Sequence, residues 1–285
     1  MKRMGAFFLS NLAMMLLLVL AFYALRLDLY GSALPSLLNF IALAGASLLC
    51  AYCAFFISRY KARQSLATKF IETPRNPMED WLLGIVAQQA RQAGIRSPKV
   101  GIYDSVDINA FASGINRSMI AVSSGMLCFM PRDETEAVLG HEISHLARHD
   151  MSRLIAYQGA LNLGLFYFSV LSAYGISGLF FNQTGEMALL MMMLGAELFF
   201  SVLVVLLLMR FSRQLEFRAD AGGAALSKRA AMIAALERLN SERWWPPPEK
   251  MAVCGIKGSI SSGLRHLLMS HSTLGERISL LKRGY

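Results

Sequence analysis

The residues best suited to chemistry in this sequence are His141, Glu142 and His145, which form the motif His-Glu-Ile-Ser-His. Two histidines four residues apart lie on the same face of an α-helix, so both imidazoles can bind one zinc ion. The glutamate between them can then act on a water molecule at that ion. Because the chain contains only 5 histidines, the motif should seldom arise by chance. It therefore predicts a metal-dependent hydrolytic site.

A catalytic zinc usually has three protein ligands and keeps a fourth position for water. The segment from Gln214 to Asp220 carries further acidic residues and supplies the missing ligand. His149 continues the line of the motif histidines, but imidazoles spread so far along a straight helix cannot all make bonds of about 2.0–2.1 Å to one ion. We therefore do not expect His149 to be a ligand.

The sequence around the motif predicts a helix in water and not one embedded in lipid. Pro131-Arg132-Asp133 resembles an entry turn, with Asp133 as the N-cap and Glu136 completing a capping box. The predicted helix runs from Asp133 to Arg148. Its polar flanks argue against a protease whose active site lies within the lipid.

Composition places the chain among membrane proteins, because 55% of its residues are hydrophobic and only 16% are charged. Four apolar segments are long enough to cross a bilayer. The third contains polar residues, so a hairpin that enters the membrane only partly is an alternative. Glu197 lies inside the fourth, in either a structural role or one in substrate handling. The four segments are Met4–Leu25, Leu34–Ile57, Leu154–Phe181 and Met187–Phe211.

Lysine and arginine flank these segments on one side, which predicts the orientation of the chain. Both termini and the block 58–152 should be cytoplasmic, with two short loops outside. A signal peptide at the first segment is the alternative, but no convincing cleavage site follows it. This topology gives four parts: a transmembrane hairpin at 1–58, a catalytic block at 59–152, a second hairpin at 153–211 and a helical block at 212–285.

The net charge of +9 is explained by these flanks and by attraction to anionic lipid. No basic patch interleaved with aromatic residues favours nucleic acid as a partner. Cys50 and Cys53 form a C-x-x-C pair, but they lie within an apolar segment, where they fit small hydrophobic residues better than a metal or redox pair. We expect neither disulfides nor a cysteine zinc site.

The catalytic block should be a mixed α+β unit. Pro77–Ala93 has the pattern of an amphipathic helix, and Lys99–Tyr103 and Met119–Ser123 have that of short strands. We expect Met119–Ser123 to be the exposed sheet edge that holds an extended peptide, with Asn109 nearby to position it. Beyond the fourth apolar segment, Phe217–Asn240 is helical in character, although Gly222-Gly223 could bend or break it. Ser259–Leu281 returns to helices.

Together these features resemble the HtpX family of bacterial inner-membrane zinc metalloproteases, which is related to the CAAX prenyl proteases. The resemblance rests on the motif at 141–145, the Asn-Ala-Phe-Ala segment before it, Glu-Phe-x-Ala-Asp after a hydrophobic hairpin, and the N-terminal apolar pair. It implies a gluzincin site with one zinc ion bound by His141, His145 and Glu216, and Glu142 as general base. It also implies that Asp220 orients a ligand. It further implies a role for His271 and Arg277 near the reacting carbonyl. Here the chain departs from the family pattern, because it has His271-Ser272 where the family has His-Pro.

The sequence and the resemblance lead to one functional prediction. We expect an α-helical integral membrane protein with a mixed α+β, cytoplasmic, zincin-like catalytic domain. It would lie in the bacterial inner membrane and cut polypeptides, namely unfolded or damaged membrane proteins. The quality-control role rests on the resemblance alone. The alternatives are a processing protease with one dedicated membrane-associated substrate and a non-catalytic membrane scaffold or chaperone.

Overall fold

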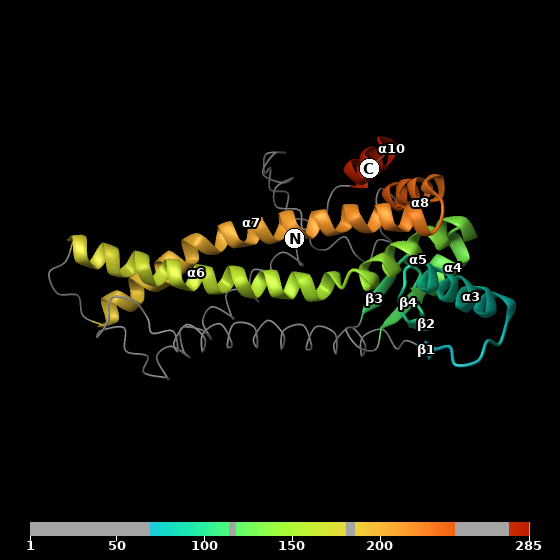
Figure 1. Ribbon diagram of the computed structural model, residues 1–285, viewed down its shortest axis with the longest axis horizontal. Coiled ribbons are helices and arrows are strands. Elements are labelled where there is room, and N and C mark those ends of the chain that lie inside the picture. The colour runs from blue at the N-terminus through green and yellow to red at the C-terminus, as the bar shows by residue number, and fades with distance from the viewer. Residues whose placement is uncertain (1–68, 114–117, 181–185, 243–273, 285) are drawn as a thin grey trace, which may run out of the picture. The chain divides into compact units, whose positions relative to one another are not determined.

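The computed structural model of the chain describes residues 69–113, 118–180, 186–242 and 274–284 (Figure 1). It divides into two units, one formed by residues 1–58 and 153–211 and the other by residues 59–152 and 212–285. Each unit is described by itself. The first two predicted apolar segments, Cys50, Cys53 and His271 lie outside the described residues.

The second unit contains a four-stranded sheet in the order β1-β2-β4-β3. β2 and β4 are parallel, while β1 pairs with β2 and β3 pairs with β4 in antiparallel fashion. The bounds of β2 and β4 are those expected from their apolar runs. The strands are β1 (Lys69–Phe70), β2 (Lys99–Tyr103), β3 (Ala110–Ser113) and β4 (Met119–Ser123).

The prediction that Met119–Ser123 forms the exposed edge is wrong. β4 is a central strand, paired with β2 on one side and with β3 on the other, and each of its residues is buried. This position explains the continuous apolar run of β4, since a strand buried on both faces needs no polar alternation. The edge strand on this side is β3, which follows directly after Asn109.

Three helices pack around the sheet: α3 (Pro77–Gln92), α4 (Ser124–Phe129) and α5 (Arg132–Ala147). α3 starts where predicted, since Asn76 accepts a hydrogen bond from the Glu79 amide and Pro77 is already fixed in a helical φ. The shared core joins these helices to β2, β4 and α8, and it comprises Leu82, Val86, Val100, Ile120, Val122, Met126, Met130, Leu139, Ile143 and Ala235.

α5 starts without the predicted capping box. Pro131 is the N-cap residue, and no side chain caps the helix. The carbonyl of Pro131 accepts the amide of Thr135 at 2.9 Å, so the helix begins one residue early and Asp133 falls in its first turn. There its charge still favours the helix N-terminus. The helix also ends earlier than expected, at Ala147, and His149 adopts a left-handed φ of 53°.

The C-terminal part of this unit is helical. α7 (Glu186–Leu226) enters it from the apolar segment, and α8 (Arg229–Glu242) and α10 (Leu274–Lys282) follow. Phe217–Asn240 is helical as expected, and the interruption falls at Ser227-Lys228, whereas α7 runs unbroken through Gly222-Gly223. α10 packs on α8 and α5 through Ile278 and Leu281.

The first unit contains most of α6 (Asp150–Phe180) and the apolar part of α7, which lie side by side in Figure 1. Tyr157 stacks on Phe211 with ring centroids 4.4 Å apart, and Leu165 packs with Val204 and Leu208. By length and composition, Asp150–Ala173 and Met191–Leu226 could each cross a membrane. Large apolar side chains are exposed along both helices, as lipid contact would require, including Phe168, Leu171, Leu179, Phe199, Val202 and Leu203.

Candidate metal centre

The structure brings the three expected ligands together. His141 and His145 project from α5 and Glu216 from α7, and one ligand atom from each lies within 4.8 Å of the others. The two Nε2 atoms are 3.1 Å apart. Glu216 lies across from both, with Oε2 3.8 Å from Nε2 of His141 and Oε1 3.8 Å from Nε2 of His145.

A buried carboxylate holds the other nitrogen of each imidazole. Nδ1 of His141 lies 2.9 Å from Oδ1 of Asp220, and Nδ1 of His145 lies 2.8 Å from Oδ2 of Asp150. A carboxylate accepts a hydrogen bond, so each Nδ1 carries the proton and each Nε2 presents a lone pair. This tautomer is the one that a metal at Nε2 requires.

These residues fit a zinc ion. Two Nε2 lone pairs that face each other at 3.1 Å repel unless a proton or a metal cation lies between them. A tetrahedral zinc ion with bonds of about 2.0–2.1 Å places two nitrogen ligands about 3.3 Å apart, close to that spacing. Two histidines and a glutamate are also a known ligand set of catalytic zinc. The arrangement therefore suits one zinc ion with an open fourth position.

Electrostatics at the site favour positive charge. Burial alone would lower the pKa of His145, but the hydrogen bond to Asp150 and the charges of Glu142 and Glu216 raise it above its ordinary value. Burial would likewise raise the pKa of Asp220, yet hydrogen bonds from Arg277 and His141 hold it below its ordinary value. Carboxylates that stabilise a protonated imidazole also stabilise a metal cation.

Arg277 binds two carboxylates of the site, those of Asp220 and Glu216. Its Nε and Nη2 donate to the two oxygens of Asp220 at 2.6 and 2.5 Å, and its Nη1 lies 3.1 Å from Oε2 of Glu216. The side chain is 11% exposed. The resemblance implied a role for Arg277 near the reacting carbonyl; the structure places its guanidinium against Asp220 and against the expected ligand Glu216.

Glu142 lies beside the edge strand. Its Oε2 accepts a hydrogen bond from the backbone amide of Ala112 in β3 at 2.7 Å. Burial raises the pKa of Glu142; the two histidines and the Ala112 amide oppose that rise, and Glu216 adds to it. A carboxylate with a raised pKa is better suited to receive a proton at neutral pH.

Two glycines of α7 let it approach α5 closely enough to complete the site. A Cβ atom on Gly222 would lie 2.0 Å from Oγ of Ser144, and one on Gly223 would lie 2.9 Å from the backbone N of His141. Both positions need the absence of a side chain. Asp220 lies within one turn before this contact and Glu216 about two turns before it, so the close packing sets how far they stand from the histidines.

The remaining predicted residues are placed as follows. Asn109 is exposed just before β3, and its backbone pairs with Ser123 and with the hydroxyl of Tyr103. His149 is exposed beyond the end of α5, as expected for a residue that is not a ligand. Sequence reasoning missed Asp150 as a partner of the site. Its only signal in the sequence is an acidic residue five positions after His145.

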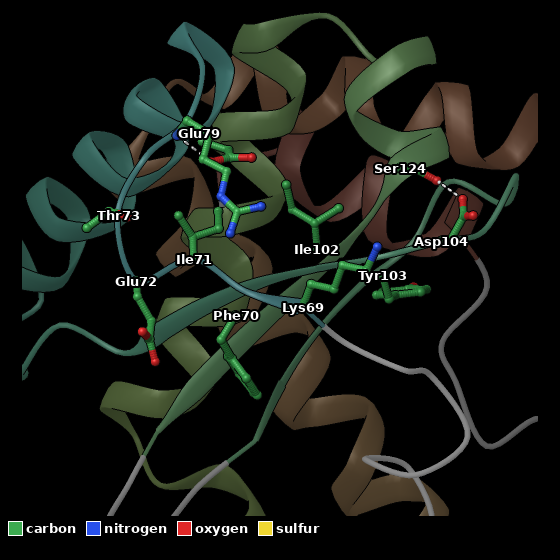
Figure 2. A pocket seen from close by; sticks show the side chains of 11 residues that line it. Lys69, Phe70, Ile71, Glu72, Thr73, Glu79, Ile102, Tyr103, Asp104 and Ser124 are labelled. Carbon is green, nitrogen blue, oxygen red and sulfur yellow. Dashed lines mark hydrogen bonds between the residues drawn. The ribbon is translucent and has the colours of Figure 1, made fainter.

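A cavity of about 690 Å³ lies away from the metal centre, and Figure 2 shows its lining. Its walls come from β1, the end of β2, the segment that leads into α3, and Ser124 at the start of α4. Ser124 donates to Asp104 at 3.0 Å on one wall. β1 and β3 are the two opposite edges of the sheet. The cavity lies at β1, whereas Glu142 contacts β3.

The fold and the site define a metal-dependent peptidase, and comparison with known proteins gives its family. The chain belongs to peptidase family M48, whose model matches residues 77–284. It is 42% identical over 292 residues to a "Protease HtpX homolog" of Thiobacillus denitrificans, covering 99% of both chains. It is also 42% identical over 293 residues to "Protease HtpX" of Aeromonas hydrophila, covering 99% of this chain and 100% of that one.

A solved structure shares the fold. Ste24p of S. mikatae superposes with a TM-score of 0.64 at 16% sequence identity, over 96% of this chain. The chain spans 62% of the length of that protein. These comparisons confirm the resemblance to HtpX. The chain is thus a metalloprotease with a membrane-protein fold. The comparisons favour this interpretation over the alternative of a non-catalytic scaffold.

Proposed function

We propose that the chain is a zinc endopeptidase in which His141, His145 and Glu216 bind one zinc ion and Glu142 is the general base. The observation that carries this proposal is the meeting of the three ligand atoms within 4.8 Å, with each imidazole oriented by a carboxylate. Asp220 orients His141, and Arg277 holds both Asp220 and Glu216 in place.

A bound zinc ion supplies Lewis acidity, which polarises the scissile carbonyl and lowers the pKa of water to about 7. Glu142 takes a proton from the attacking water and passes it to the leaving amine. General acid–base catalysis of this kind contributes typically about 10²–10⁴-fold to the rate. The hydrogen bond from Ala112 fixes one oxygen of Glu142, which leaves the other to accept the proton.

The edge strand β3 would hold the substrate. The carbonyl of Asn109 accepts the amide of Ser123 in β4, whereas the Ala112 amide turns away from β4 to Glu142. Alternate residues of the strand therefore present their backbone groups outward, where an extended peptide can add as a further strand. Such backbone pairing depends little on side chains and suits a protease of broad specificity. Asn109, at the start of this edge, would help to position the peptide.

The catalytic unit would be a mixed α+β, zincin-like domain on the cytoplasmic side of the bacterial inner membrane, and the chain would cross that membrane several times. Support comes from the lysine and arginine flanks of the apolar segments and from the two apolar helices. We propose unfolded or damaged membrane proteins as substrates. This role in quality control rests on the resemblance to the HtpX family alone.

The metal assignment is tested with purified full-length protein in detergent. Glu216→Ala should lose zinc and activity together, whereas Glu142→Gln should retain zinc and lose activity, since Glu142 is not a ligand. Zinc content by elemental analysis and cleavage of an unfolded reporter protein are the two readouts. Stoichiometric zinc in Glu216→Ala would contradict the assignment.

The substrate class is tested in cells by comparing the membrane proteomes of strains with the wild-type chain and with Glu142→Gln. Quality control predicts that many different membrane proteins accumulate in the variant strain. Accumulation of a single protein would point instead to a dedicated processing protease. No accumulation would contradict both roles.

A further inference from the structure

We propose that Asp150 is a positioning residue of the metal centre, which orients His145 as Asp220 orients His141. This inference rests on the proposed zinc site and extends it to a residue outside the ligand set. Oδ2 of Asp150 lies 2.8 Å from Nδ1 of His145, and Asp150 is 3% exposed. The contact is as short as that between His141 and Asp220, and the two carboxylates are similarly buried, although the ring of His145 is more exposed than that of His141.

Because Asp150 is buried, its hydrogen bond with His145 is energetically important. An ionised carboxylate removed from water is costly unless hydrogen bonds and opposite charge compensate it. In the described part of the chain, Oδ1 of Asp150 is buried without a hydrogen-bond partner, so His145 is the main side-chain compensation of this anion. A metal cation on Nε2 of His145 would add the missing positive charge through the ring. Asp150 and the cation should therefore stabilise each other.

The backbone between His145 and Asp150 is shaped for this contact. α5 ends at Ala147, and His149 takes a left-handed φ of 53°, which is uncommon for a residue other than glycine. This turn starts a new helix at Asp150, whose carboxylate thereby reaches back to the ring of a residue five positions earlier. A straight continuation of α5 would place position 150 on another face of the helix.

A purely structural role for Asp150 is the competing explanation. An acidic residue in the first turn of α6 would stabilise that helix through its dipole without any effect on the metal. Asp133 provides a matched control, because it is an exposed acidic residue in the first turn of α5. Asp133→Asn removes a similar helix interaction and no hydrogen bond to a histidine.

The test measures the dissociation constant for Zn²⁺ of the full-length chain in detergent, by competition with a chromophoric chelator. We expect Asp150→Asn to weaken zinc binding about 10- to 100-fold, Asp150→Ala to weaken it at least as much, and Asp133→Asn to leave it unchanged. Substitution with Co²⁺ gives a second readout, because a rotated or displaced His145 changes the visible absorption spectrum of the bound ion. Thermal unfolding of the metal-free proteins reports separately on the stability of the helix.

Each outcome has a definite meaning. Unchanged zinc affinity and an unchanged Co²⁺ spectrum in Asp150→Asn, with or without lower stability of the metal-free protein, would overturn the proposal. If Asp150→Ala does not fold, Asp150→Asn decides, because it keeps the size of the side chain. Failure of the wild-type chain to bind zinc would instead overturn the proposed function, so the two failures are distinguishable.

Discussion

Arg277 donates two parallel hydrogen bonds to Asp220, from Nε at 2.6 Å and from Nη2 at 2.5 Å, although the two residues are 57 positions apart in the sequence. The same guanidinium reaches Glu216 with its third nitrogen. Through this fork, the C-terminal helix α10 takes part in the metal centre without supplying a ligand. Arginine suits this position because its planar fork matches a carboxylate and stays charged when buried.

Replacing Arg277 should therefore strongly lower the free energy of unfolding of the catalytic unit. Arg277→Gln leaves Asp220 buried with less compensation, and breaking a buried ion pair costs about 3–5 kcal/mol in the free energy of unfolding. Lys282→Gln on the same helix is the control, because its pair with Glu237 is exposed and should contribute only about 0–1 kcal/mol. Thermal or denaturant unfolding in detergent compares the two. Equal losses for both variants would contradict the role of the fork.

The helix contact at Gly222 gives a second prediction. Gly222→Ala should destabilise the protein by about 1–3 kcal/mol, because the new Cβ meets Oγ of Ser144 at 2.0 Å and its Cβ at 2.7 Å. Ser144→Gly in the same chain should restore much of the loss, whereas Ser144→Ala should not, since it keeps the Cβ atom. Gly84→Ala in α3, where no atom lies within 4 Å, should be neutral or stabilising. Unfolding temperatures of the four variants test this pattern.

The amide of Ala112 gives a third prediction. Ala112→Pro removes the hydrogen bond to Oε2 of Glu142, and a hydrogen bond to a charged group contributes about 1.5–3 kcal/mol. We expect kcat to fall about 10- to 150-fold while zinc content stays stoichiometric. Ala112→Gly keeps the amide and should change kcat by less than about threefold. An active proline variant would show that Glu142 does not depend on β3 for its orientation.

The orientation of the chain in the membrane can be tested with reporter fusions. The positive flanks predict that fusions after Lys69 and at the C-terminal Tyr285 report the cytoplasm, and that a fusion within residues 182–186 reports the opposite side. The physical reason is that lysine and arginine are retained on the cytoplasmic side during insertion. A cytoplasmic signal from the 182–186 fusion would instead indicate a hairpin that enters the membrane without crossing it.

Features that depend on local spacing could be predicted from the amino-acid sequence alone. His141 and His145 share a helix face because four residues make about one helical turn, whatever the rest of the chain does. The bounds of β2 and β4 followed from short apolar runs limited by polar and turn residues. The roles of Glu216 and Asp220 were assigned through the resemblance to the HtpX family, and their spacing of one helical turn is compatible with both facing the histidines.

The contacts between these elements could not be predicted in this way, because they depend on packing in three dimensions. Asp150 reaches His145 because His149 takes a left-handed conformation, which no residue pattern announces for a histidine. Gly222 had the appearance of a helix breaker, since its lack of a side chain is a local cost. Its value lies in the close approach to Ser144, which exists only once α7 packs on α5. Contacts between distant segments depend on packing in three dimensions, and helical or strand periodicity carries no information about them.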